Sequence, residues 1–264
     1  VFFNFSQLNY NLLPFIVTNC RYFIVEYDYK FCKYRSIELH KQTTGEKCDC
    51  TNSDYGKIVS TLFAGAEHVF WMSDEQKKRY QRRYTFLTDE KTSRLSSIFD
   101  VEDLEYISRL RKARKDLKIK KEYVVLNSNS WIKGTEETRS YLREQQINFV
   151  ELSGLQYHEM LRSLSEHTGL VFMPLGGDTC PRIVIEAKLL GLKLILNDNV
   201  QHASEKWWQT NNLDLIESYL LDGHNRFWDK LTEFINRDIK LSGYTTTHNV
   251  VKSTYPWKES ITSL

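Results

Sequence analysis

Strand-like and helix-like segments alternate regularly between residues 123 and 196, and this alternation constrains the fold more than any other feature. Four apolar runs rich in β-branched and aromatic residues begin at residues 123, 148, 169 and 192: YVVLNS, NFVELS, GLVFMP and LKLILN. The segments GTEETRSYLREQQ, LQYHEMLRSLSEH and PRIVIEAKLLG lie between them and read as helices. This alternation is typical of βαβ units, which build a parallel sheet with right-handed crossovers. The sequence therefore predicts an α/β fold.

The segment GLVFMPLGGDTCPRIVIEAKLLGLKLILNDNV carries the most chemical information. It predicts a strand buried on both faces, a loop, a helix and another strand. Pro181 suits the first helical position, with Thr179 or Cys180 as the cap before it, and Gly191 ends the helix. Glu186 lies within this apolar helix, and a buried carboxylate requires a partner. That partner is either a nearby Lys or Arg, or a ligand bound where the loop opens the helix.

Ligands of open α/β sheets bind beyond the carboxyl ends of the strands. The residues after the four predicted strands are polar or rich in glycine, at 127–130, 153–154, 176–179 and 197–199. Such residues suit a pocket for phosphate and sugar, although strand ends are commonly polar. His202 follows the fourth strand and is close enough in sequence to reach such a pocket, but a lone histidine is more often structural.

Asp178 and Glu186, with the helix IVIEAKLLG and the strand LKLI, resemble the E-x7-E signature of retaining glycosyltransferases of family 4. That family has the GT-B fold, with a Rossmann-like nucleotide-binding domain, and its typical run is EGFGLPVLEAMACGTPVI. The resemblance implies that Glu186 holds the nucleotide ribose and that Asp178 faces the donor sugar. Here Asp178 replaces the first Glu, and Pro181 replaces a Gly whose backbone N–H faces the donor. Proline has no N–H and cannot donate that hydrogen bond.

WIKGTEE resembles the KG step of the same family, which implies that Lys133 contacts the donor diphosphate. An ammonium beside the first N–H groups of a helix concentrates positive charge there. The family often has an Arg five residues earlier, where this chain has Ser128, and a solvated surface lysine is the alternative interpretation of Lys133. The donor-binding set implied by the resemblance is Lys133, Gly134, Gly177, Thr179, Arg182, Ile183 and Glu186, with Arg182 and Ile183 contributing helix N–H groups.

Residues 1–97 predict a partial α/β domain. VFFNF, YFIVEYD and HVFWMS read as strands, and GKIVSTLFAGAE and DEQKKRYQRRY read as helices, the second capped by Ser73 or Asp74. SQLNYNLLPFIVTN reads as a helix interrupted by Pro14. The polar segment KFCKYRSIELHKQTTGEKCDCTNSDYG predicts a long loop, which in a compact domain is usually functional or mobile.

YDYKFCKYR resembles the HDYxxxCPRG segment of many family 4 enzymes, with Tyr27 at the position of the His, and HVFWMSDEQKKRY resembles their following strand and helix. The resemblance implies that the chain lacks the start of the N-terminal, acceptor-side domain and could be inactive without it. Asp28 is the predicted acceptor-side catalytic residue, with Glu26 as the alternative.

A helix with Asp100 as its cap joins the two halves, and residues 98–245 form the predicted nucleotide-sugar-binding domain. The basic run 109–121 is either a phosphate patch or a solvated helix face, and the interspersed acids favour the latter. Residues 246–264 include STYPWKESITSL, which resembles the family's final helix that crosses back to the N-terminal domain.

Composition excludes several classes of protein. The net charge is +2 and the basic residues are spread among acids, so nothing indicates nucleic-acid binding. No run of about 18 apolar residues predicts a membrane span, and no G-x-G-x-x-G run indicates a dinucleotide-binding reductase. Five irregularly spaced cysteines favour a reduced, cytoplasmic protein over a disulfide framework.

Cys32, His40, Cys48 and Cys50 could supply four tetrahedral zinc ligands. They contain no C-x2-C pair, and their spacings match no common zinc site. Free thiols in a loop are therefore favoured, and the sequence predicts no metal.

The predicted function is the transfer of a sugar, of the hexosyltransferase type, from a UDP- or GDP-sugar to a glycan or other hydroxyl acceptor, with retention at the anomeric carbon. The donor is a substrate, and no cofactor is expected. Peripheral association with a membrane and the oligomeric state stay open. The alternative is a non-catalytic nucleotide-sugar-binding or assembly module, which the residues at Ser128, Pro181 and Tyr27 favour.

Overall fold

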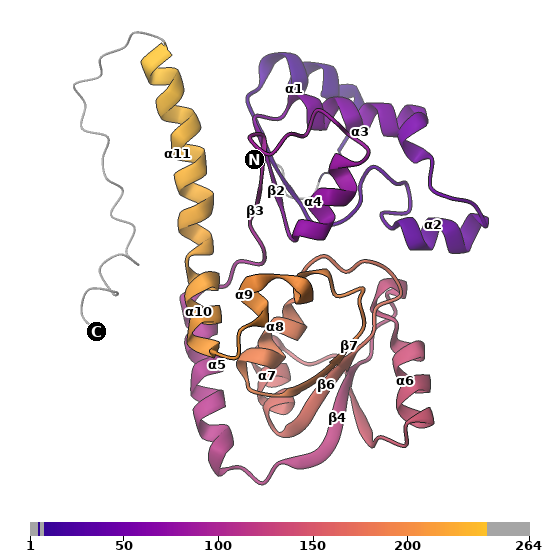
Figure 1. Ribbon diagram of the computed structural model, residues 1–264, viewed down its shortest axis with the longest axis vertical. Helices are drawn as coiled ribbons and strands as arrows, with labels where there is room; N and C mark the ends of the chain where they lie inside the picture. The colour runs from indigo at the N-terminus through magenta and orange to yellow at the C-terminus, as the bar shows by residue number, and fades with distance from the viewer. Residues whose placement is uncertain (1–4, 6–7, 242–264) are drawn as a thin grey trace. The chain divides into compact units, whose positions relative to one another are not determined.

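The computed structural model describes Phe5 and residues 8–241, and it confirms the predicted α/β class with two wholly parallel sheets (Figure 1). The first sheet has the order β1-β2-β3 and the second has the order β5-β4-β6-β7. The strands are β1 (Phe23–Glu26), β2 (His68–Trp71), β3 (Thr92–Arg94), β4 (Lys120–Leu126), β5 (Phe149–Leu152), β6 (His167–Phe172) and β7 (Lys193–Leu196).

Helices connect the parallel strands, as parallel pairing requires. The α-helices are α1 (Leu13–Asn19), α2 (Ile37–Thr44), α3 (Asp54–Gly65), α4 (Asp74–Gln81), α5 (Val101–Ala113), α6 (Thr135–Glu144), α7 (Tyr157–Ser165), α8 (Arg182–Leu189), α9 (Lys206–Gln209), α10 (Leu213–Leu221) and α11 (Gly223–Leu241). Short 3-10 turns include η2 (Cys50–Asn52), η4 (Trp131–Lys133) and η5 (Gln201–Ser204).

Residues up to Gly223 form one compact unit that contains both sheets, and residues from His224 form a second unit, whose described part is α11. The predicted crossing helix at 246–264 and the first four residues of the VFFNF segment lie outside the described residues. The division into segments 1–97, 98–245 and 246–264 stays a prediction.

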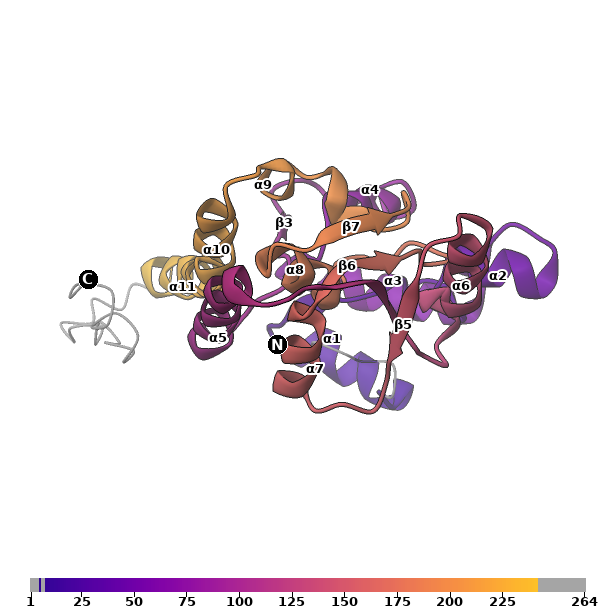
Figure 2. The same cartoon turned by 90° about the horizontal axis from the view of Figure 1, so that it is seen from below.

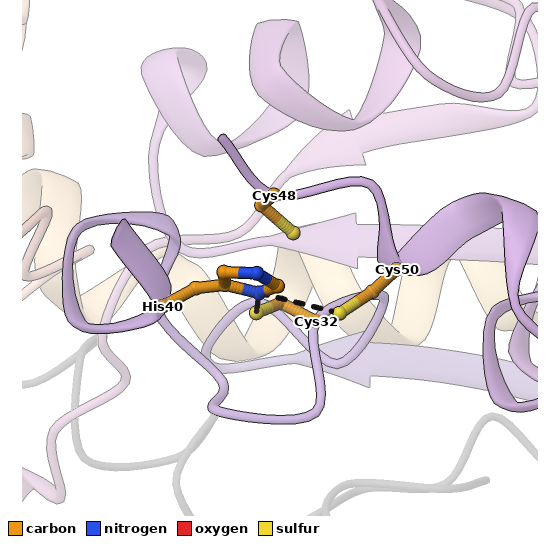
Figure 3. A group of neighbouring side chains, drawn as sticks. All are labelled: Cys32, His40, Cys48 and Cys50. Carbon is orange, nitrogen blue, oxygen red and sulfur yellow. Dashed lines mark hydrogen bonds between the residues drawn. The ribbon is translucent and has the colours of Figure 1, made fainter. Parts of the chain in front are cut away.

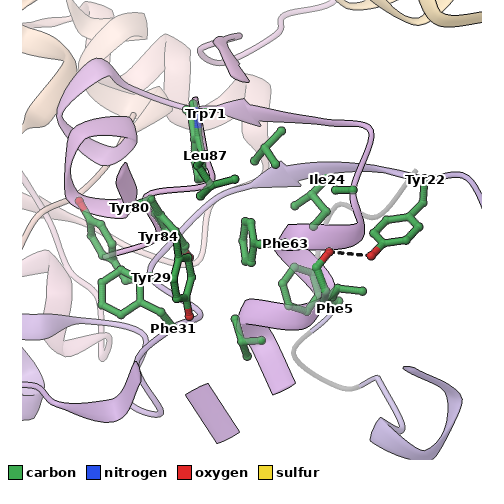
Figure 4. Packing of buried hydrophobic residues seen from close by; sticks show 14 of the residues in the cluster. Phe5, Tyr22, Ile24, Tyr29, Phe31, Phe63, Trp71, Tyr80, Tyr84 and Leu87 are labelled. Atoms are coloured by element: carbon green, nitrogen blue, oxygen red, sulfur yellow. Dashed lines mark hydrogen bonds between the residues drawn. The ribbon is translucent and has the colours of Figure 1, made fainter. Parts of the chain in front are cut away.

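The first sheet packs on an aromatic core (Figure 4). Trp71 of β2 is fully buried and stacks on Phe63 of α3, with ring centroids 6.1 Å apart and planes 5° apart. Tyr80 of α4 lies 4.7 Å from Trp71 and meets Phe31 edge-on at 4.9 Å. Large rings of this kind bury much apolar area and interact favourably edge-to-face. This core fixes the positions of β1, β2 and the helices around them.

Helices cover both faces of the second sheet, with α6 on one face and α7 and α8 on the other (Figures 1 and 2). Val125 and Val171 pack with Leu142 of α6 in one cluster. Leu170, next to Val171 in β6, is completely buried on the opposite face, because successive strand residues point to opposite faces. The prediction that the GLVFMP strand is buried on both faces is confirmed.

Three local predictions are wrong. The polar segment after β1 contains α2, which begins after Ser36, whose hydroxyl accepts a bond from Leu39 N, and ends at Gly45 with φ of 76°. Pro14 does not interrupt a helix; it stands in the first turn of α1, where its missing N–H costs nothing. Pro181 is the N-cap of α8, one residue earlier in the helix than expected.

The predicted capping of α4 is confirmed, since the Ser73 hydroxyl accepts a bond from Gln76 N at 3.1 Å. Helices α5 and α10 lie side by side, as Figures 1 and 2 agree, and Arg111 of α5 forms ion pairs with Asp214 and Glu217 of α10. Within the described part of the chain, no helix combines the length and apolar character needed to cross a lipid bilayer.

Candidate functional site

The second sheet has a topological switch point between β4 and β6. The chain moves from β4 to β5 on one side, and then returns to add β6 on the other side of β4. In sheets of this type, the crevice beyond the carboxyl ends of the strands at the switch point is the usual ligand site. Lys133 follows β4, in η4, and Asp178 follows β6. Lys133 Nζ lies 2.8 Å from Asp178 Oδ2, so residues 45 positions apart meet at this crevice.

Backbone geometry fixes the two loops that carry Lys133 and Asp178. Gly134 has φ of 60°, and a Cβ at this position would lie 2.1 Å from the carbonyl oxygen of Met173. Only glycine allows the chain after β4 to approach the end of β6 so closely. On the other side, Asp178 N donates to Asn199 O at 2.9 Å, and Gln201 N donates to Asp178 O at 3.1 Å. These bonds attach the loop after β6 to the loop after β7.

Close packing also explains why the loop after β6 has a glycine at position 177. A Cβ at Gly177 would lie 2.2 Å from Nε2 of Gln201 and 2.9 Å from the Arg79 guanidinium. Gln201 is buried and its side chain accepts a bond from the Ser73 hydroxyl at 3.0 Å, so it could not move without losing that bond. Gly177 therefore lets the loop lie directly against residues of α4 and η5.

A pocket of about 410 Å³ opens beside Asp178. It brings together four residues that the sequence singled out, namely Asp28, Gly177, Asp178 and Thr179. The other lining residues are Tyr27, Tyr34, Arg35, Ser36, Leu39, Ser130, Trp131 and Ile132. The pocket therefore receives residues from the ends of β1, β4 and β6, and from α2.

Asp28 and Arg35 form a second opposite-charge pair on the pocket wall. The carboxylate of Asp28 accepts from Arg35 Nε at 2.7 Å, and a second guanidinium nitrogen also contacts it. Arg35 has φ of 57°, a backbone conformation uncommon for residues other than glycine. Sequence reasoning missed Arg35, because nothing in the linear pattern predicts that the turn between β1 and α2 brings it back to Asp28.

Glu26, the alternative to Asp28, is fully buried and does not line this pocket. Its carboxylate accepts from Lys30 Nζ at 3.1 and 3.2 Å and from Asp28 N at 3.0 Å. Burial raises the pKa of Glu26 above its ordinary value, and the nearby Lys30 ammonium opposes that rise. Glu26 thus acts as a structural group that orients the backbone of Asp28.

Glu186 lines a different hollow, of about 410 Å³, with Asp103, Tyr157, Met160 and Arg182. Only 2% of Glu186 is exposed, and its Oε1 accepts from the Tyr157 hydroxyl at 3.0 Å and lies 3.5 Å from Arg182 Nε. Burial raises the pKa of Glu186, while Arg182 and the Tyr157 hydroxyl lower it by less. The structure therefore gives this carboxylate a cationic partner and also places it on an open hollow.

The structure corrects one further sequence interpretation and confirms another. The helical spacing of Tyr157, Met160, Leu161 and Leu164 predicts one core stripe. Leu161 and Leu164 are completely buried, whereas Tyr157 and Met160 line the Glu186 hollow. The interpretation of His202 as structural is confirmed, because it is completely buried with its ring centroid 4.6 Å from that of Trp208.

Hydrogen bonds join the loops of the two sheets within the compact unit. Thr179 Oγ1 donates to Tyr27 O at 2.8 Å, and Ser97 Oγ donates to Cys180 O at 3.1 Å. Asp74 N donates to Glu205 Oε1 at 2.8 Å. Ile183, in the first turn of α8, has an N–H that the helix itself leaves without an acceptor. The site thus combines a charged pair, free helix N–H groups and polar loops from both sheets.

No protein-family model matches the chain, and no curated protein matches it. Among solved structures, the chain is similar to sucrose-phosphate synthase from Thermosynechococcus elongatus, at 13% identity and a TM-score of 0.47, over 78% of this chain and 60% of that chain. It is also similar to a UDP-forming trehalose-phosphate synthase from Burkholderia xenovorans, at 10% identity and a TM-score of 0.47, over 82% and 62% of the two chains.

A further similar structure is HepE from Anabaena in complex with UDP and glucose, at 11% identity and a TM-score of 0.46, over 85% of this chain and 76% of that chain. The matched region spans 60% of the length of the sucrose-phosphate synthase. Likeness at these identities and scores does not define a reaction.

Proposed function

We propose that this chain binds a nucleotide-diphosphate sugar at the carboxyl edge of the β5-β4-β6-β7 sheet and transfers the sugar to a hydroxyl acceptor. The Lys133–Asp178 pair carries the proposal. It combines a cation and a carboxylate at the switch point of a parallel sheet, beside a pocket of about 410 Å³. An ammonium there, 28% exposed, can release Asp178 and bind a diphosphate.

The two hollows suit the two ends of such a donor. The pocket beside Asp178 would take the sugar, and the hollow beside Glu186 would take the nucleoside, with the ribose hydroxyls donating to the Glu186 carboxylate. The N–H groups of Arg182 and Ile183 open α8 after Asp178, and helix N–H groups favour phosphate oxygens. The finer assignments are a GT-B fold, membership of family 4 and retention of configuration, and these rest on the sequence resemblance.

Transfer passes through an oxocarbenium-like state, so the protein must stabilise the departing diphosphate and position the acceptor. Lys133 and the first N–H groups of α8 would stabilise the developing negative charge. Asp28, which also lines the pocket and is paired with Arg35, is the candidate to position the acceptor hydroxyl. No step in this scheme requires a group that the chain itself lacks, apart from donor and acceptor.

The same geometry fits a module that binds a nucleotide sugar without transferring it. Ser128 is uncharged where the family often has an Arg, and its N–H is held 3.3 Å from Thr135 Oγ1. Lys133 is then the cation that must meet the diphosphate. Binding of the donor without release of free nucleotide would favour the module over the transferase.

The test combines binding and turnover with UDP-, GDP- and ADP-sugars. Lys133→Met should weaken binding of the preferred nucleotide at least about tenfold, because a charge-assisted bond contributes about 1.5–3 kcal/mol. Lys120→Met is the matched control, because Lys120 begins β4, at the end of the strand away from Lys133, and pairs with the half-exposed Glu166. Equal affinity of Lys133→Met and the wild-type chain would contradict the assignment.

A further inference from the structure

The segment after β1 holds a cluster of metal-binding side chains that the proposed transfer reaction does not use. Cys32, His40, Cys48 and Cys50 converge, and their ligand atoms all lie within 4.8 Å of one another (Figure 3). Cys32, His40 and Cys50 are buried, and Cys48 is half-buried. We propose that these four residues form a structural zinc site.

The distances from His40 to two of the sulfurs match those around a tetrahedral zinc ion. Zinc binds sulfur at about 2.3 Å and histidine nitrogen at about 2.0 Å, so a tetrahedral angle separates the sulfur and nitrogen ligands by about 3.5 Å. His40 Nδ1 lies 3.5 Å from Cys32 Sγ and 3.4 Å from Cys50 Sγ. The imidazole nitrogen thus faces two sulfurs at the separation that a shared zinc ion would impose.

The chemistry of the four ligands selects the metal. Three thiolates and one imidazole are a common zinc-binding set, whereas calcium and magnesium prefer oxygen. The ligand atoms are also too close together to enclose a larger metal cluster, since none is more than 4.8 Å from another. A single disulfide would use two of the three thiols and leave the third thiol and the imidazole unexplained.

The ligand spacing, C-x7-H-x7-C-x-C, is unusual, and it explains why the linear pattern did not predict the site. The fold brings the residues together. Cys32 lies in the turn after β1, and His40 lies in α2, on a helix that the sequence did not predict. Cys48 follows α2 and Cys50 begins η2, so the ion would join both ends of α2 to the end of β1.

The site would act on the candidate pocket through the segment that it closes. The chain between Cys32 and Cys50 carries Tyr34, Arg35, Ser36 and Leu39, all of which line the pocket beside Asp178. Helix α2 has eight residues, a length at which an isolated helix is marginal. Binding of zinc supplies folding free energy to such small segments, and here it would fix one wall of the pocket.

The first test measures the metal content of the untagged wild-type chain, purified under reducing conditions from zinc-containing medium. The expected result is about one zinc ion per chain. His40→Ala and the double change Cys48→Ser with Cys50→Ser should lower the zinc content at least about fivefold. Cys20→Ser is the control that keeps the full content, because Cys20 is exposed and lies outside the cluster. Zinc content unchanged in the cluster variants would overturn the proposal.

A second measurement does not depend on the folding of variants. Zinc in the wild-type chain is exchanged for cobalt(II), and the visible d–d bands and thiolate charge-transfer bands of tetrahedral cobalt are expected. Alkylation without prior reduction should label the cluster cysteines only after a chelator has removed the metal. A wild-type chain without these bands, or with a disulfide between two cluster cysteines, would overturn the proposal.

Discussion

Replacement of His202 by phenylalanine should reduce the loss of folding stability that this protein suffers as the pH falls. His202 is completely buried, its ring is stacked 16° from the plane of Trp207, and it meets Trp208 edge-on. Neither ring nitrogen has a hydrogen-bond partner among the described residues. Burial, and secondarily the Lys188 ammonium, lowers the pKa of His202 from 6.5 to about 3.

Proton linkage gives the direction and the size of this change in the free energy of unfolding. The unfolded histidine takes up a proton below its pKa of 6.5, whereas the folded one stays neutral until about pH 3, so stability is lost as the pH falls between these values. At about pH 4.5 the loss is about 3 kcal/mol, since each pH unit is worth about 1.4 kcal/mol. The phenylalanine variant keeps the aromatic packing and loses only this term.

The assay is urea unfolding followed by tryptophan fluorescence, at about pH 7.5 and about pH 4.5, for both chains. The wild-type free energy of unfolding should fall by about 3 kcal/mol more than that of His202→Phe. Each chain is compared with itself, so an added cost of fitting the larger ring cancels. Equal losses in the two chains would refute a buried, neutral His202.

Two further changes test the loops that support the site. Gly134→Ala should lower the free energy of unfolding by at least about 2 kcal/mol, because φ of 60° is unfavourable for alanine and the added Cβ would meet Met173 O at 2.1 Å. Urea unfolding measures this loss. Gly154→Ala is the control and should cost less, because Gly154 also has a positive φ but has open space around it. Ser73→Ala should cost about 2 kcal/mol in the same assay, since the hydroxyl caps α4 and donates to Gln201, and a cost below about 0.5 kcal/mol would contradict this.

The second sheet could be predicted well because each of its strands and helices carries its own periodic pattern. The runs GLVFMP and LKLILN are apolar enough to indicate buried strands, and β6 and β7 are found there. Helix α2 was missed because its residues are mostly polar. Ser36 and Gly45 mark its two ends, and these capping residues are the sequence signal that identifies it.

The sequence identified several residues of the candidate site but not the contacts between them. Lys133 and Asp178 were each singled out, yet their contact depends on the switch in strand order, which no local pattern encodes. The position of Arg35 depends on the turn between β1 and α2, and the Cys32, His40, Cys48 and Cys50 cluster depends on how the chain returns after α2. Tyr157 lies on a predicted core stripe but lines the Glu186 hollow. Local periodicity predicts elements, whereas these contacts arise from tertiary packing.

In the proposed function, a nucleotide sugar binds where α8 begins, with its ribose on Glu186. Isothermal titration of the preferred nucleoside diphosphate into the wild-type chain and into Glu186→Ala tests it most directly, with Glu166→Ala as a control, because Glu166 is half-exposed and pairs with Lys120. About one nucleotide should bind per wild-type or Glu166→Ala chain, and none should bind to a folded Glu186→Ala chain. Equal affinity in all three chains, or no binding of UDP, GDP or ADP to the wild-type chain, would contradict it.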